Sequence, residues 1–157
     1  MARTTYGTII IRSNNPDNMA QRTRTAAAAA AVTPGMLLKQ NTSGTVQSHA
    51  TADGVALGRM VAVENQWSNH GSGLAIDHAY ATNETVHYIH AVPGDQLYML
   101  VADSQTITIG DALVSNGDGY LKEPTVSATT LTDAIIGYAA SAITTSGSTG
   151  RVLVNIA

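Results

Sequence analysis

Five histidines are the residues of this chain that could most readily bind a metal ion or transfer a proton near neutral pH. Their spacing supports neither role. His87 and His90 lie three residues apart in a segment that is typical of a strand, so their side chains point to opposite faces. No histidine lies four residues from another, as the helical metalloprotease motif requires. We therefore expect surface or interface histidines and no metal site; the five are His49, His70, His78, His87 and His90.

Other patterns that mark enzymes are also missing from the sequence. The chain has no cysteine, which removes thiol nucleophiles, disulfides and cysteine-based metal sites. Neither a Gly-x-Ser-x-Gly nucleophile elbow nor a glycine-rich phosphate loop ending in lysine occurs. The turn Asn116–Gly119 has one carboxylate and lacks the others that a calcium-binding EF-hand needs. We predict that the protein is not an enzyme and binds no cofactor. A small barrel enzyme, with histidines and carboxylates meeting in one cavity, is the weaker alternative.

The elements that position these side chains are predicted to be strands. The 157 residues include 12 valines, 11 isoleucines and 20 threonines, whose branched side chains pack well on a pleated sheet. Turn-forming clusters recur at short intervals between apolar runs, as in all-β proteins. We therefore predict an all-β fold: a single β-barrel or β-sandwich of about eight short strands. The predicted strands are 36–40, 45–50, 55–64, 85–92, 97–102, the hairpin 113–114 with 120–122, and the hairpin 135–143 with 151–156.

The first 24 residues carry the opposite net charge from the remainder. Four arginines and one aspartate give this segment a net charge of +3, whereas residues 25–157 hold four basic and ten acidic residues, a net charge of −6. Basic N-terminal arms often bind nucleic acid or an acidic protein surface. Because arginine pairs with carboxylates through two parallel hydrogen bonds, an acidic protein surface suits this segment better than phosphate. The arginines are Arg3, Arg12, Arg22 and Arg24.

We predict that residues 1–31 form an extended basic arm outside a β body of residues 32–157. Within the arm, Tyr6 and the run Ile9–Ile11 favour a short strand that pairs with this chain or with a neighbour. The six alanines Ala26–Ala31 allow either one helical turn or an extended linker that another backbone can approach closely. The alternative for the whole arm is a frayed terminus whose charges have no binding role.

Neither a membrane nor a nucleic acid is an expected partner. No run of about 18 apolar residues occurs, so we expect no membrane-spanning helix. The apolar run near the N-terminus is also shorter than the hydrophobic region of a signal peptide. We therefore expect synthesis in the cytoplasm. The acidic body repels phosphate, and four arginines alone would bind nucleic acid only weakly.

Trp67 lies in a polar loop and could serve as a partner anchor or as a lid on the end of the barrel. With Tyr80 and Tyr88 it could also form a platform for stacking a sugar ring. A carbohydrate- or receptor-binding module on a virion surface is therefore the competing functional class.

Several turn and strand features over residues 32–157 together resemble tailed-bacteriophage head decoration (cement) proteins. They include Gly-Asp turns that lead directly into apolar strands and a hairpin closed by Asn-Gly-Asp-Gly. The stretches that carry the resemblance are Val32–Gly35, Val61–Asn65, Val92–Asp95, Gly110–Gly119, Ile136–Ala139 and Arg151–Val154.

The resemblance implies a structural virion protein that binds the outer surface of the capsid, made in the host cytoplasm, and stabilises the shell by clamping adjacent subunits of the major capsid protein. It implies no catalytic residues. We expect self-association as well, as a trimer on local threefold axes first and as a dimer second, because a weakly charged barrel has apolar surface to cover. The expected capsid-binding residues are Arg3, Tyr6, Ile9, Ile10, Ile11, Arg12, Arg22 and Arg24.

Overall fold

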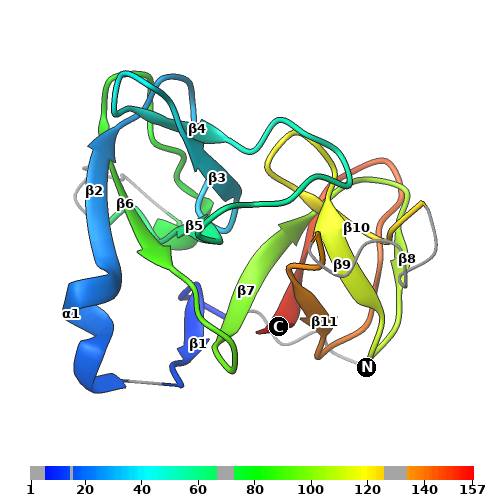
Figure 1. Ribbon diagram of the computed structural model, residues 1–157. Helices are drawn as coiled ribbons and strands as arrows, with labels where there is room; N and C mark the ends of the chain where they lie inside the picture. Colours follow the sequence, from blue (N-terminus) through cyan, green and yellow to red (C-terminus); the bar gives the residue numbers. More distant parts are fainter. Residues whose placement is uncertain (1–5, 15, 67–72, 126–133) are drawn as a thin grey trace.

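The computed structural model describes residues 6–14, 16–66, 73–125 and 134–157. In these ranges the chain is mostly β-structure, arranged as two bodies that lie side by side (Figure 1). The first body, here called the N-terminal sheet, is antiparallel throughout. Its strands, in spatial order, are β2 (Thr23–Ala27), β6 (Thr85–His90), β5 (Met60–Ala62), β3 (Leu37–Gln40) and β4 (Val46–Ser48).

The N-terminal sheet curls until its two edges meet. Immediately after β2, Ala28 forms a single parallel bridge with Val46 of β4. The backbone nitrogen of Ala29 donates to the carbonyl oxygen of Val46 at 2.8 Å. Ala28 is fully buried there, so its small side chain permits the close approach of the two backbones.

The second body, here called the C-terminal barrel, is a closed ring of five strands. Its first and last members, β7 and β13, pair with each other over six residues, from Gly150 opposite Val101 to Asn155 opposite Gln96. The ring is β7 (Gln96–Val101), β10 (Leu121–Lys122), β9 (Ala112–Ser115), β11 (Gly137–Ala139) and back through β13 (Gly150–Ile156) to β7.

Short elements complete the described structure. The strand β1 (Ile10–Arg12) pairs with the start of β7, beside the C-terminal barrel. A 3-10 turn (Pro16–Asn18) and the four-residue helix α1 (Met19–Arg22) connect β1 to β2. A second 3-10 turn spans Ala75–Asp77, and β8 (Thr106–Ile107) pairs with β12 (Ile143–Thr144). No helix in the described part of the chain is long and apolar enough to span a lipid bilayer.

The two bodies are joined by backbone and side-chain hydrogen bonds. The nitrogen of Leu37 donates to the oxygen of Gly119, and the nitrogen of Gly119 donates to the oxygen of His49. Close by, the His49 ring and the Ser115 hydroxyl lie 2.8 Å apart. Gly119 has a φ of +88°, and a Cβ there would lie 2.9 Å from Ser48. This position therefore requires glycine both for its backbone conformation and for the closeness of the two bodies.

Arg151 of β13 is a charged residue that crosses between the bodies. Its guanidinium donates to the carbonyl oxygens of Pro34 and Ile76, each at 2.7 Å. Burial lowers the pKa of Arg151, and the carboxylate of Asp77 opposes that effect. Both acceptors belong to loops of the first half of the chain, so β13 stabilises those loops as well as the barrel.

The all-β class and the presence of a barrel are confirmed. Most predicted strands are present, although the described residues hold thirteen strands and not about eight, because many have only two or three residues. The hairpin at Asn116–Gly117 forms between β9 and β10, and β11 pairs with β13 as predicted. Val152, Val154 and Ile156 of the last strand are buried, as their alternation predicts.

The prediction of an arm outside the body was wrong for its described part. Ile9 is fully buried in the core, and residues 10–12 and 23–27 are strands of the two bodies. The alanine run is not a helical turn: Ala26 and Ala27 belong to β2, Ala28 forms the bridge to Val46, and the chain then bends at Ala29 and Ala30. The physical reason is that apolar side chains and unpaired backbone groups at the N-terminus find partners within the same chain.

Candidate interaction surface

The N-terminal isoleucines were predicted to contact a capsid, but the structure places them against the chain's own core. Ile9 has 0% exposure, and its carbonyl oxygen accepts a hydrogen bond from the nitrogen of Tyr98 at 2.8 Å. Ile10 and Ile11 are half-buried and pack on the same core. Tyr6 is also half-buried and lies edge-on to the Tyr98 ring, with centroids 5.1 Å apart. Ile9 is therefore not a binding residue, which corrects the prediction for that position.

Glu64 holds the start of this segment in place. Its carboxylate accepts a hydrogen bond from the hydroxyl of Thr8 at 2.7 Å and another from the nitrogen of Ile9 at 3.2 Å. Glu64 follows β5, so these contacts connect the N-terminal segment to the N-terminal sheet. No local pattern indicates these contacts, because Glu64 lies 56 residues from Thr8 and 55 residues from Ile9 along the chain.

Arg22 is committed to a buried ion pair inside the molecule. Its guanidinium lies 2.7 Å from the carboxylate of Asp95, whose side chain is fully buried. Burial works against the charged form of Asp95, but hydrogen bonds from Arg22 and from the nitrogens of Val92 and Asn14 outweigh it and lower the pKa of this carboxyl. The predicted role of Arg22 in binding a partner was therefore wrong, since the carboxylate that it pairs with is in its own chain.

Arg12 and Arg24 are exposed. Of the arginines predicted to bind the capsid, these two lie within the described residues and present their charge to solvent. Arg24 extends from β2, where its guanidinium donates to the carbonyl oxygen of Thr23 at 3.0 Å. Arg12 ends β1. Arg3 lies outside the described residues. The exposed cations therefore lie on an N-terminal segment that is folded into the body.

Tyr80 does not form a sugar-stacking platform. Its side chain has 0% exposure, and its hydroxyl donates to the carbonyl oxygens of Val63 and Glu64 at 3.0 and 3.1 Å. Burial raises the pKa of Tyr80 to about 12. The prediction for Tyr80 was wrong because the residues around it are polar and suggest an exposed loop. In the structure Tyr80 forms an antiparallel β-bridge with Val32, and its ring is buried in the core. Trp67 lies outside the described residues.

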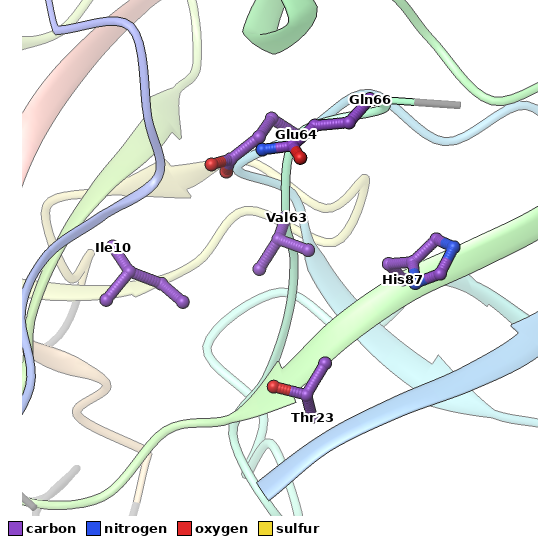
Figure 2. Close-up of a pocket in the computed structure, with 6 residues that line it drawn as sticks. All are labelled: Ile10, Thr23, Val63, Glu64, Gln66 and His87. Carbon is purple, nitrogen blue, oxygen red and sulfur yellow. The ribbon is translucent and has the colours of Figure 1, made fainter. Parts of the chain in front are cut away.

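A cavity of about 160 Å³ lies between the N-terminal segment and the N-terminal sheet (Figure 2). In Figure 2 the carboxylate of Glu64 points toward the chain at Ile10, whereas the ring of His87 lies on the other side of Val63. The carboxylate and the imidazole therefore do not converge on one point in the cavity. Among the described residues, no group of three or more histidines and carboxylates could hold a metal ion.

A larger groove, of about 320 Å³, lies on the N-terminal sheet. Its floor includes the buried side chains of Leu38 and Met60, and Lys39 contributes a cation. Val55 and Leu57 flank it and are strongly exposed, Leu57 at 83%. Sequence reasoning missed this groove, because single apolar residues in a turn-rich segment are common on surfaces.

Comparison with known proteins identifies a similar fold. No protein-family model matches the chain, and no curated protein matches it. Among solved structures, the chain is similar to the N base of the head fiber protein gp8.5 of bacteriophage phi29, with a TM-score of 0.53 and 16% sequence identity. The similarity covers 86% of this chain and 92% of that chain. At this identity it shows a shared fold.

Proposed function

We propose that this chain is a structural protein of a tailed-phage virion that binds the outer surface of the capsid and stabilises the shell by clamping adjacent major capsid protein subunits. The observation that carries the proposal is the shared fold with a phage head fiber base, over nearly the whole of both chains. The location on the virion, after synthesis in the host cytoplasm, belongs to the same proposal. Neither nucleic acid nor membrane is proposed as a partner.

The rigidity of the molecule supports a clamping role. The C-terminal barrel is closed by a continuous β-ladder, and Arg151 and His49 tie the two bodies together. A protein that holds neighbouring subunits in place must resist deformation, and close-packed β-cores with satisfied polar contacts do so. Many copies on a symmetric shell would add avidity to a weak single contact.

Arg12 and Arg24, together with Arg3, are the proposed contacts to capsid carboxylates. Both described arginines are exposed, and no carboxylate lies within 4 Å of either among the described ion pairs. Because β1 and β2 are integral to the body, the capsid would be gripped by a folded face and not by a free tether. Binding by arginine–carboxylate pairs should weaken as salt rises.

The test is co-sedimentation of the purified protein with assembled shells of major capsid protein. Removing residues 1–24 is a poor test, because it also removes Ile9 from the core and Arg22 from Asp95. We expect Arg12→Gln with Arg24→Gln to weaken binding about tenfold, as the loss of two exposed charge pairs predicts. Arg59→Gln is the matched control and should bind like the wild type. Absence of wild-type binding to shells at low salt would contradict the proposal.

A further inference from the structure

The groove on the N-terminal sheet has the features of a docking site. Its apolar floor is open to solvent beside Leu57, which presents most of its side chain to water. Exposed apolar side chains beside a hollow mark interaction surfaces more often than scattered single ones do. The charged residue among those lining the groove is Lys39, and no carboxylate lines it. An occupant should therefore offer an apolar side chain next to negative charge.

The C-terminal barrel carries a turn with these complementary features. Ile109, at 72% exposure, projects from the tip of the turn between β8 and β9. The carboxylate of Asp111 accepts hydrogen bonds from the nitrogen and the hydroxyl of Thr108, at 2.6 and 2.8 Å. These bonds hold the turn rigid, so little conformational entropy would be lost when the turn is bound. Among the described residues, apart from its two chain neighbours, Gly110 has no atom within 4 Å of where a Cβ would lie, so the tip is open.

Two carboxylates accompany Ile109. Hydrogen bonds from Thr108 lower the pKa of Asp111. The pKa of Glu123 is raised, first by burial and then by its hydrogen bond with Asp111 and the negative charge of that residue. The carboxyl groups of Asp111 and Glu123 are therefore neighbours that share a hydrogen bond, and no cation pairs with either among the described ion pairs. A lysine brought to this turn from outside would place a positive charge beside the ionised carboxylate of Asp111.

We propose that the groove beside Leu57 and Lys39 binds the Thr108–Asp111 turn of a second copy of this chain, with Ile109 on the apolar floor and Lys39 near Asp111 and Glu123. This deepens the self-association expected from the sequence and does not depend on capsid binding. The charge pattern of the chain agrees with it: residues 1–91 carry six basic and five acidic groups, whereas residues 92–157 carry two basic and six acidic groups. The nearly neutral half of one copy, with a net charge of +1, meets the acidic half of the next, with a net charge of −4.

The proposed interface is head-to-tail, with the groove of one copy on the turn of the next copy. Groove and turn belong to different bodies of the molecule (Figure 1). β3 and β5 form the floor of the groove in the N-terminal sheet, whereas the turn follows β8 beside the C-terminal barrel. Such an interface leaves one groove and one turn free in a dimer, so the assembly closes only as a ring. A trimer is the smallest ring that satisfies the expected threefold arrangement.

Light scattering after size-exclusion chromatography at about 100 μM tests the proposal on the full chain. We expect the wild type to form a closed oligomer and Leu57→Asp and Ile109→Asp each to weaken association about tenfold to a hundredfold, the effect of losing one buried apolar side chain. Leu74→Asp, another exposed leucine outside both surfaces, is the control and should leave the oligomer intact. Circular dichroism should show that all three variants are folded.

Mixing the two disrupted variants gives the sharper result. The Leu57→Asp protein keeps an intact turn and the Ile109→Asp protein keeps an intact groove, so an equimolar mixture should form a heterodimer although each variant alone is monomeric. A symmetric interface made of one shared patch would give no such rescue. Likewise, Lys39→Glu and Glu123→Lys should each weaken association, and the double variant should recover it, because the charge pair is restored with reversed sign.

Each contrary outcome overturns the proposal. A wild type that is monomeric at 100 μM removes the self-association, and an oligomer that survives both aspartate substitutions places the interface elsewhere. If the wild type is monomeric and only Leu57→Asp loses co-sedimentation with shells, then the groove binds the capsid protein and not a second copy. Loss of shell binding by the arginine variants, with the oligomer intact, would concern the proposed capsid contacts alone.

Discussion

The N-terminal sheet and the C-terminal barrel close in different ways. In the barrel, β7 and β13 pair over six residues, so backbone hydrogen bonds alone complete the ring. In the N-terminal sheet the edges meet at one bridge, between Ala28 and Val46. Side-chain contacts then hold the adjoining N-terminal segment, through Arg22 with Asp95 and Glu64 with Thr8. The comparison teaches that the first half of the molecule depends on particular polar side chains, whereas the second depends on its ladder and its aliphatic core.

The features suited to binding concentrate in the half that closes less completely. Both described cavities are lined by residues 10–90, and the exposed arginines also belong to that half. A sheet closed by few backbone bonds has strand ends and loops free to form grooves, whereas a continuous ring fills its interior with side chains. The C-terminal barrel therefore supports the molecule, and the N-terminal sheet supplies most of its interaction surface.

Replacing Asp95 by Asn should have the largest effect and should act first on the N-terminal segment. The substitution leaves the buried guanidinium of Arg22 without a counter-charge, which costs about 3–5 kcal/mol of unfolding free energy. Chemical denaturation measures the loss. Hydrogen exchange should show faster exchange in β2 than in β13, because β2 follows Arg22 directly.

The double variant with Arg22→Met and Asp95→Asn is the control for this effect. It should be less destabilised than Asp95→Asn alone, because no buried cation is left unpaired. In the wild type, the lowered pKa of Asp95 gives stability that is complete above about pH 4 and is lost as the pH falls through the folded-state value. Asp95→Asn should lose that acid dependence. A uniform increase of exchange in β2 and β13 would contradict the difference between the two bodies.

Replacing Gly137 by Ala tests the barrel. A Cβ at Gly137 would overlap the backbone oxygen of Asn155 and lie 2.7 Å from Val154, both on the paired strand β13. We expect a loss of about 1–3 kcal/mol, the usual cost of overpacking a core. Gly7→Ala is the matched control, since within the described ranges, apart from its two chain neighbours, no atom lies within 4 Å of an added Cβ at Gly7. Equal melting temperatures for the two variants would contradict the prediction, because they would show that β11 and β13 can move apart to accept the added Cβ without a loss of stability.

The positions of the strands could be predicted from the sequence better than the packing of the N-terminal segment against the rest of the chain. Apolar runs between turn clusters predicted β3, β6, β7 and the β11–β13 hairpin, because alternation and turn chemistry are local signals. The burial of Arg22 and Tyr80 was missed for the same reason. Their partners, Asp95 and Val63, are 73 and 17 residues away, and no local pattern announces them. The groove beside Leu57 forms from strands and loops that only the fold brings together.

The contact between His49 and Ser115, which joins the two bodies, should make stability fall in mild acid. The loss should be smaller than that caused by Gly137→Ala. Burial lowers the pKa of His49, with the positive charge of Lys39 acting in the same direction and the bond to the oxygen of Val55 opposing it. A lowered pKa means that folding disfavours the charged imidazole, so stability is complete above the unfolded value of about 6.5 and declines as the pH falls below it. Melting temperatures at pH 7.5 and 5.5 should therefore differ more for the wild type than for His49→Gln, whose amide can still bond Ser115. Equal pH dependence in the two proteins would mean that protonation of His49 does not lower stability, which contradicts the prediction.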